Sequence, residues 1–118
     1  MAIKQNFKVI FYREDSGREP VRIFVRKLDL PEKKEVGECL QILEGRWPLG
    51  MPLVDNLAPG LWELRMRFAT RLCRILFCIE GKNIILLHSF IKKTRTTPKQ
   101  DIEIAQARRK KLGSYAYA

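Results

Sequence analysis

The hydrophobic pattern at the start of the chain predicts a strand and then a short helix. Residues 7–12 (FKVIFY) are rich in β-branched and aromatic side chains and precede a turn-like Asp-Ser-Gly at 15–17, which is typical of a strand. Pro20 suits the first turn of a helix. After it the apolar residues recur at the helical spacing of three and four positions, at Val21, Phe24, Val25 and Leu28.

A second helix is predicted from Pro31, followed by an irregular connector. One face of this helix carries the apolar residues Val36, Cys39, Leu40, Leu43 and Trp47. The two helices are expected to form a helical hairpin whose apolar faces, together with Trp47 and Trp62, belong to the core. Residues 47–60 contain three prolines and two glycines, so we expect a connector without regular structure.

Beyond residue 60 the pattern changes to a period of two, which is typical of strands with one buried face. In residues 61–68 (LWELRMRF) the apolar positions alternate with Glu63, Arg65 and Arg67. Residues 71–80 and 83–91 are two further β-rich runs, and the short link at 81–82 suits a hairpin. These three segments predict a three-stranded antiparallel meander.

A basic helix is predicted at the end of the chain. Thr97 suits the N-cap, Pro98 the first helical position and Gln100 the third, and the helix is expected to run to about Lys111. The resulting fold class is α+β, with the N-terminal strand and the meander completing one sheet. A chain of 118 residues is expected to be a single domain, with residues 113–118 as a flexible tail.

Composition limits the location and the use of the cysteines. No apolar run approaches the ~20 residues needed to cross a bilayer, and the N-terminus lacks the apolar run of a signal peptide, so we expect a cytoplasmic protein without membrane contact. Cys39, Cys73 and Cys78 have no CxxC spacing, and His88 is the sole histidine. Neither a disulfide framework nor a zinc site is indicated, and the cysteines are expected to be reduced core residues.

Positive charge is concentrated in the second half of the chain. Residues 1–60 hold ten Lys/Arg and nine Asp/Glu, whereas residues 61–118 hold thirteen and four, so +9 of the net +10 lies in the second half. Such a field concentrates phosphate polymers or acidic proteins near it. A solvated basic face that only aids solubility is the alternative, but a merely soluble surface mixes both signs. We therefore favour nucleic acid or an acidic partner.

Four segments, taken together, resemble a known family. They are LWELR at 61–65, RILF at 74–77, LLHSFIKKTRTTP at 86–98 and IEIAQAR at 102–108. In their order and spacing they are similar to the HigB-like, phage-associated branch of the RelE/ParE toxin superfamily, over residues 7 to about 111.

The resemblance implies a small RelE-like fold and the toxin of a two-gene toxin–antitoxin module. It also implies a cognate antitoxin, expected to be a helix-turn-helix protein, through which alone the chain would reach operator DNA. The RelE and HigB types cleave mRNA on the ribosome, and the ParE type inhibits DNA gyrase. A non-catalytic nucleic-acid-binding module or repressor component is a third possibility, because a fold does not assign an activity.

The residue types favour RNA cleavage without a metal. Such cleavage needs a base for the 2′-hydroxyl, cations for the dianionic phosphorane and an acid for the departing 5′-oxygen. The predicted strands supply only Glu63 and Glu80 as acids, which disfavours a two-metal nuclease, so we expect neither metal nor cofactor. The candidate catalytic residues, on three predicted neighbouring strands, are Arg65, Arg74, His88 and Lys92.

Each of these candidates has an alternative interpretation. Arg74 interrupts an apolar strand, so it is expected either to bind phosphate or to form a buried salt bridge with Glu63 or Glu80, and Arg65 has the same two readings. His88 is either a general acid or base or a hydrogen-bonded core residue.

The surrounding cations are expected to hold RNA. Crowding by other cations lowers a lysine pKa, which would let Lys92 or Lys93 share the proton transfer. The residues predicted to bind RNA, or alternatively an acidic antitoxin segment, are Arg67, Arg71, Lys93, Arg95, Lys99, Arg108 and Arg109. The hypothesis is therefore a ribosome-dependent endoribonuclease that cleaves mRNA and inhibits translation.

Overall fold

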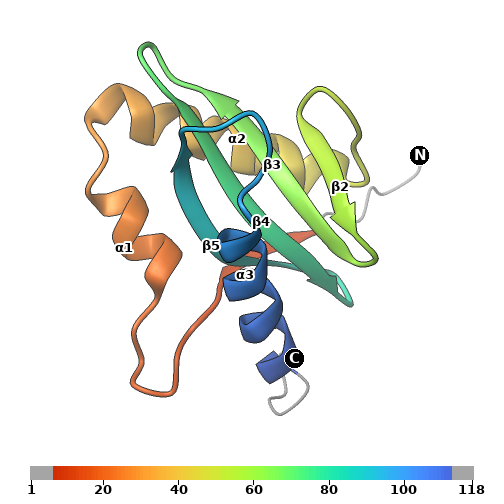
Figure 1. Cartoon of the computed structure of the whole chain (residues 1–118). Helices are drawn as coiled ribbons and strands as arrows, with labels where there is room; N and C mark the ends of the chain where they lie inside the picture. Colours follow the sequence, from red (N-terminus) through yellow and green to blue (C-terminus); the bar gives the residue numbers. More distant parts are fainter. Residues whose placement is uncertain (1–6, 113–118) are drawn as a thin grey trace, which may run out of the picture.

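The computed structural model describes residues 7–112 and contains one mixed sheet with helices on both faces (Figure 1). In chain order the elements are β1 (Lys8–Phe11), α1 (Pro20–Arg26), α2 (Leu30–Arg46), β2 (Val54–Ala58), β3 (Leu61–Arg67), β4 (Leu72–Glu80), β5 (Asn83–Lys92) and α3 (Lys99–Lys111). The predicted α+β class is confirmed. The predicted tail at 113–118 lies outside the described residues. None of the helices within residues 7–112 combines the length and the apolar character needed to span a membrane.

The five strands lie in the order β1-β5-β4-β3-β2. The pairs β2–β3, β3–β4 and β4–β5 are antiparallel, which confirms the predicted meander of β3, β4 and β5. β1 pairs parallel with β5, with Lys8 opposite Asn83 and Phe11 opposite Leu86. A parallel pair requires a long crossover, and here all the elements from α1 to β4 lie between the two paired strands in sequence.

The prediction that residues 47–60 form an irregular connector was wrong, because they contain β2. The five residues of β2 include neither proline nor glycine, and the three prolines of the segment fall outside it. Val54 opposes Leu64, and Asn56 opposes Trp62, before a register shift interrupts the pairing. A strand this short that pairs on one side only leaves little periodic signal for sequence reasoning to detect.

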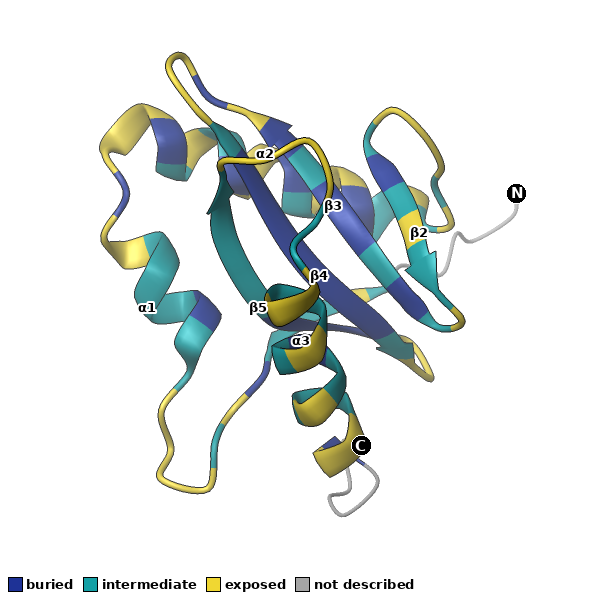
Figure 2. Ribbon diagram, in the orientation of Figure 1, coloured by how far each residue is buried: buried dark blue, intermediate teal, exposed yellow. Residues whose placement is uncertain are grey.

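The sheet separates two apolar cores. One face packs against α1 and α2, in a cluster that includes Val21, Leu43, Leu64 and Ile75. The other face packs against α3, in a cluster that includes Leu61, Leu76, Cys78, Leu87 and Ala105. β4 is therefore buried along most of its length, as Figure 2 shows. This two-sided burial explains why β4 and β5 consist of nearly continuous apolar runs.

Residues predicted to be core are found there. Trp47 packs against the first core in edge-on contacts, with its ring centroid 5.0 Å from that of Trp62 and 5.3 Å from that of Phe77. The three cysteines, Cys39, Cys73 and Cys78, are free and buried, and burial raises the pKa of each thiol to about 12. Their prediction as reduced core residues is confirmed.

The start of α3 differs from the predicted cap. Pro98 occupies the N-cap position without a side-chain cap, and the first helical residue is Lys99. Thr97 was predicted to cap this helix, but its hydroxyl donates a hydrogen bond to the carboxylate of Glu63 instead. The prediction was wrong because a buried carboxylate on β3 is the acceptor for the Thr97 hydroxyl, and sequence spacing alone does not reveal that contact.

Candidate functional site

Three rows of side chains cross the sheet on the face that carries α3. Directly opposed residues of antiparallel strands project to the same side, so the register of β3, β4 and β5 defines each row. The upper row is Arg67, Leu72 and Lys92; the middle row is Arg65, Arg74 and Phe90; the lower row is Glu63, Leu76 and His88. All four predicted catalytic residues therefore lie on one face of the sheet, as the sequence led us to expect.

A bulge in β5 places His88 on this face. Leu86 opposes Phe77 and His88 opposes Leu76, so Leu87 is an extra residue between two paired positions. Strict alternation from Leu86 would turn His88 toward the face of the sheet that packs against α1 and α2. The bulge reverses the alternation, so that Phe90 and Lys92 also share the face of the middle-row arginines.

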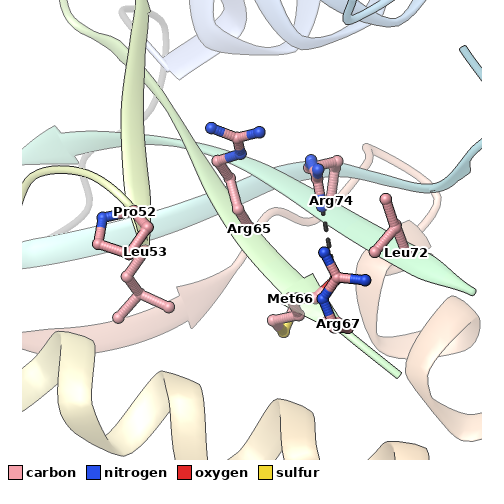
Figure 3. Close-up of a pocket in the computed structure, with 7 residues that line it drawn as sticks. All are labelled: Pro52, Leu53, Arg65, Met66, Arg67, Leu72 and Arg74. Carbon is pink, nitrogen blue, oxygen red and sulfur yellow. Dashed lines mark hydrogen bonds between the residues drawn. The ribbon is translucent and has the colours of Figure 1, made fainter. Parts of the chain in front are cut away.

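Arg74 is a buried cation at the centre of the rows, with only 4% of its side chain exposed. Its Nη1 donates to the carbonyl oxygen of Met66 at 3.4 Å (Figure 3), and to that of Cys73 at 2.9 Å. Its Nε lies 3.8 Å from Glu63 Oε1, an ion-pair distance too long for a hydrogen bond, and Nε has no hydrogen-bond partner among residues 7–112. Burial lowers the pKa of Arg74, and the charge of Arg65 lowers it further while Glu63 opposes the shift.

A hollow of about 320 Å³ lies beside these arginines, between β3, β4 and the segment that precedes β2. Figure 3 shows Arg65 and Arg74 extending from neighbouring strands at this hollow. Its lining includes no acidic side chain, and consists of Pro52, Leu53, Arg65, Met66, Arg67, Leu72 and Arg74. The hollow is therefore positively charged and partly apolar, which suits a phosphate carrying a sugar or a base.

Lys92 ends the upper row and belongs electrostatically to the same cluster. Its Nζ donates to the carbonyl oxygen of Arg95 at 2.6 Å. Burial lowers the pKa of Lys92, and the positive charges of Arg74 and Arg65 lower it further, while the Glu63 carboxylate opposes the shift. An ammonium group of lowered pKa is a better proton donor than an ordinary lysine.

The two residues at the ends of the lower row, Glu63 and His88, form hydrogen bonds with residues at the start of α3. The Glu63 carboxylate accepts the hydrogen bond from Thr97, just before the helix. His88 Nε2 lies 2.6 Å from Oδ1 of Asp101, in the first turn of the helix. These two bonds fix the position of α3 relative to the cationic hollow.

Burial lowers the pKa of His88 more than the neighbouring Asp101 raises it, which favours the neutral ring. Nε2 then donates to Asp101, and Nδ1 accepts from Arg108 Nη1 at 3.5 Å. The ring also stacks on Phe90, with 5.7 Å between centroids, and only 14% of the side chain is exposed. This geometry corresponds to the hydrogen-bonded interpretation of His88 rather than to an open acid or base.

Three of the residues predicted to bind RNA make internal contacts away from the hollow. Arg71 donates two hydrogen bonds of 2.8 Å to Glu32 on α2, on the opposite side of the sheet. Arg108 donates to the Leu87 carbonyl oxygen at 2.8 Å, and Arg109 donates to the carbonyl oxygen of Pro59 at 2.8 Å. These side chains anchor elements of the fold, and an additional role in RNA binding stays a prediction.

The other predicted RNA-binding residues are exposed. Arg67 lies in the upper row and lines the hollow. Lys93 and Arg95 are in the loop that connects β5 with α3, and Lys99 is the first residue of α3. Their side chains are accessible to a large polyanion, but their function stays a prediction.

Phe90 is a site residue that sequence reasoning missed. It opposes Arg74 in the middle row, and it packs between the second core and the His88 ring. The sequence did indicate this position, because Phe90 lies two residues from both His88 and Lys92 and therefore shares their side of the strand. An aromatic residue in an apolar strand is read as core by default.

The described residues offer no built metal site, since within 7–112 no three His, Cys, Asp or Glu side chains gather into a potential metal-binding group. The expectation that catalysis needs no metal stays a prediction. What the arrangement can do chemically is bind a phosphate between arginines and supply a proton from Lys92.

The mixed five-stranded sheet with helices on both faces is consistent with the RelE-like class of small α+β folds. The family model described as Phage derived protein Gp49-like (DUF891) matches residues 23–110. The chain therefore belongs to the Gp49-like family, which is a RelE-like toxin family. No curated protein matches the chain in sequence.

Proposed function

We propose that this chain is a HigB-like endoribonuclease, the toxin of a toxin–antitoxin module, which cleaves mRNA on the ribosome without a metal ion. The observation that carries this proposal is the middle row, in which Arg65 and Arg74 oppose each other directly and line one hollow. Like charges in opposed positions disfavour folding, so the pair has a cost that a bound phosphodiester would remove. Membership of a RelE-like toxin family supports the same assignment.

The cluster suits the chemistry of 2′-hydroxyl attack. The 2′-oxygen bonds to the neighbouring phosphorus, the 5′-oxygen leaves, and the products carry a 2′,3′-cyclic phosphate and a 5′-hydroxyl. Arg65 and Arg74 would stabilise the extra negative charge of the phosphorane, a type of interaction whose loss costs about 10²- to 10³-fold in rate. Lys92 would donate its proton to the departing 5′-oxygen, and the 2′-hydroxyl proton would pass to solvent.

Phe90 and His88 would position the substrate. An aromatic ring beside a phosphate site provides a surface on which a base stacks without strict sequence preference. The His88 ring stacks against Phe90, and the hydrogen bond with Asp101 fixes the orientation of the His88 ring. In this scheme His88 is a positioning residue and transfers no proton.

The partners follow from the family and the charge. A toxin of this kind requires a cognate antitoxin, expected to be a helix-turn-helix protein that covers the basic surface and makes the contacts with operator DNA. Exposed cations such as Lys93, Arg95 and Lys99 suit phosphates of ribosomal RNA. Because the substrate is translated mRNA, the protein would act in the cytoplasm.

Expression without antitoxin tests this proposal. We expect growth arrest and, in primer extension on translated messages, new 5′ ends that disappear in the Lys92→Ala variant. The Lys34→Ala variant is the control, because Lys34 is exposed on α2, on the face of the sheet opposite the three rows, and it should retain the new ends. Intact messages together with stalled gyrase would contradict the proposal and favour a ParE-like inhibitor.

A further inference from the structure

A second positively charged hollow, of about 280 Å³, lies between α1, β5 and α3. Cations reach it from three parts of the chain: Arg18 precedes α1, Lys27 ends it, and Arg108 comes from α3. His88 and Ser89 of β5 complete the polar part of the lining. No carboxylate is among the lining residues, so the hollow has the character of an anion site.

The cations around this hollow exceed the acids that neutralise them. Glu14 is shared between two of them, since its carboxylate lies 4.0 Å from Arg18 Nη1 and 3.8 Å from Arg108 Nη2. Lys27 forms no ion pair with any residue in the range 7–112. Glu14 thus pairs with two of the three cations and Asp101 pairs with His88, so the positive charge of Lys27 is left over for a ligand.

Arg108 is held in place before any ligand binds. Its Nη1 donates to the carbonyl oxygen of Leu87 and contacts His88 Nδ1, and its guanidinium carbon lies 5.8 Å from the centroid of the Tyr12 ring. Burial lowers the pKa of Arg108 through the loss of hydration. A fixed, partly dehydrated guanidinium binds an anion with little further loss of side-chain freedom.

The hollow adjoins the proposed cleavage site. Arg74 opposes Phe90, and His88 lies two residues before Phe90 on β5. With a rise of about 3.3 Å per residue and about 4.8 Å between strands, the backbones of Arg74 and His88 are roughly 8 Å apart. A single RNA strand of a few nucleotides therefore spans both hollows. His88 lines the second hollow and belongs to the lower row, next to the middle row that contains Arg74.

We propose that the hollow formed by Arg18, Lys27 and Arg108 binds a second phosphate of the same RNA, one or a few nucleotides from the scissile one. This inference rests on the proposed ribonuclease function. The short distance between His88 and Arg74, which lines the cleavage hollow, favours RNA over an acidic segment of a protein partner. The second phosphate fixes the direction and register of the RNA across β5, so that one particular phosphodiester reaches Arg65 and Arg74.

Binding of an uncleavable RNA tests the inference. The probe is a single strand of about ten nucleotides with 2′-O-methyl riboses, a length within the range that one small domain holds, followed by fluorescence anisotropy at several salt concentrations. The double variant Arg18→Ala/Lys27→Ala removes two exposed cations from the hollow. The matched control Arg13→Ala/Arg26→Ala removes the same charge from exposed residues near α1 that do not line it.

We expect the hollow variant to weaken binding about tenfold and to reduce the slope of log affinity against log salt by about 0.7, because the loss of one phosphate contact contributes about 0.7 on single strands. The control should keep the slope of the wild-type protein. A probe of about two nucleotides, too short to span both hollows, should bind equally to both variants.

Equal behaviour of the two double variants on the long probe would overturn the inference. So would unchanged RNA binding combined with weaker binding of the antitoxin, which would assign the hollow to the protein partner. The proposed function fails by a different result, namely intact translated mRNA in the presence of the wild-type protein, whatever the binding data show.

Discussion

Arg65 on β3 and Arg74 on β4 occupy directly opposed positions, so two guanidinium groups share one face of the sheet. Arg74 is almost fully buried, and burial lowers its pKa, while the nearby Glu63 carboxylate raises this pKa and the charge of Arg65 lowers it. Like charges directly opposite on neighbouring strands destabilise the pair by a few tenths of a kcal/mol to about 1 kcal/mol. The fold thus retains an unfavourable contact at the place where a phosphodiester would relieve it.

The first prediction concerns the opposed charge of Arg65. The Arg65→Gln substitution removes the repulsion, so we expect the free energy of unfolding to rise by about 0.5 kcal/mol in urea denaturation. The same substitution removes a group that stabilises the phosphorane, and cleavage should fall about 10²-fold or more. A variant that loses stability and keeps its cleavage rate would contradict this role.

The second prediction concerns the pH dependence of cleavage. The pKa of Lys92 is lowered by burial and by two neighbouring arginines. If its ammonium group donates the proton, the cleavage rate falls as pH rises through this lowered pKa, below the usual lysine value of about 10.4. Lys92→Arg stays protonated and should lack this alkaline decrease, whereas Lys93→Arg should retain it. A decrease that persists unchanged in Lys92→Arg would exclude Lys92 as the donor.

The third prediction concerns stability and His88. Burial lowers the pKa of folded His88, so below about pH 6.5 the unfolded chain binds a proton more readily than the folded one. The contribution of the neutral ring is complete above that pH and is lost as pH falls through the lowered folded pKa. In thermal melts between about pH 7 and 5, the wild-type Tm should fall more than that of His88→Gln, which cannot titrate. The reverse order would indicate a charged His88 paired with Asp101.

The fourth prediction separates a structural arginine from the RNA-binding set. Arg71 donates two hydrogen bonds to Glu32, which is buried and belongs to the capping box at the start of α2. Arg71→Gln should lower the Tm, because the Glu32 carboxylate loses charged donors. Cleavage of mRNA should be unchanged, since this contact lies on the face opposite the three rows. If Arg71→Gln keeps the Tm of the wild-type protein but binds RNA more weakly, Arg71 is an RNA-binding residue after all.

Much of the fold followed from the period of the apolar residues. The switch from helical spacing at Val21 and Phe24 to alternation after Leu61 predicted the helices and the meander, and each was found. β2 was missed because the prolines and glycines around it dominate a short segment. The Thr97 cap was missed because a buried carboxylate elsewhere in the sheet binds the same hydroxyl.

The candidate site was predictable only in part. Alternation placed Arg65 on one side of its strand, and the order of the strands placed Arg74 beside it. The position of His88 depends on the bulge at Leu87, which no sequence period reveals. Its contacts with α3 depend on tertiary packing, so the sequence offered two interpretations of this histidine without a means of choosing.

The most direct test of the central claim is a double-mutant cycle on mRNA cleavage by translating ribosomes, with Arg65→Gln, Arg74→Gln and the double variant. Each protein is first checked for folding by circular dichroism, and Arg26→Gln, an exposed α1 substitution, is the control. If both arginines hold one phosphodiester, each single change costs about 10²-fold or more and the double costs clearly less than the product. Multiplicative losses would contradict a shared phosphate, and wild-type cleavage by folded Arg74→Gln would contradict the site itself.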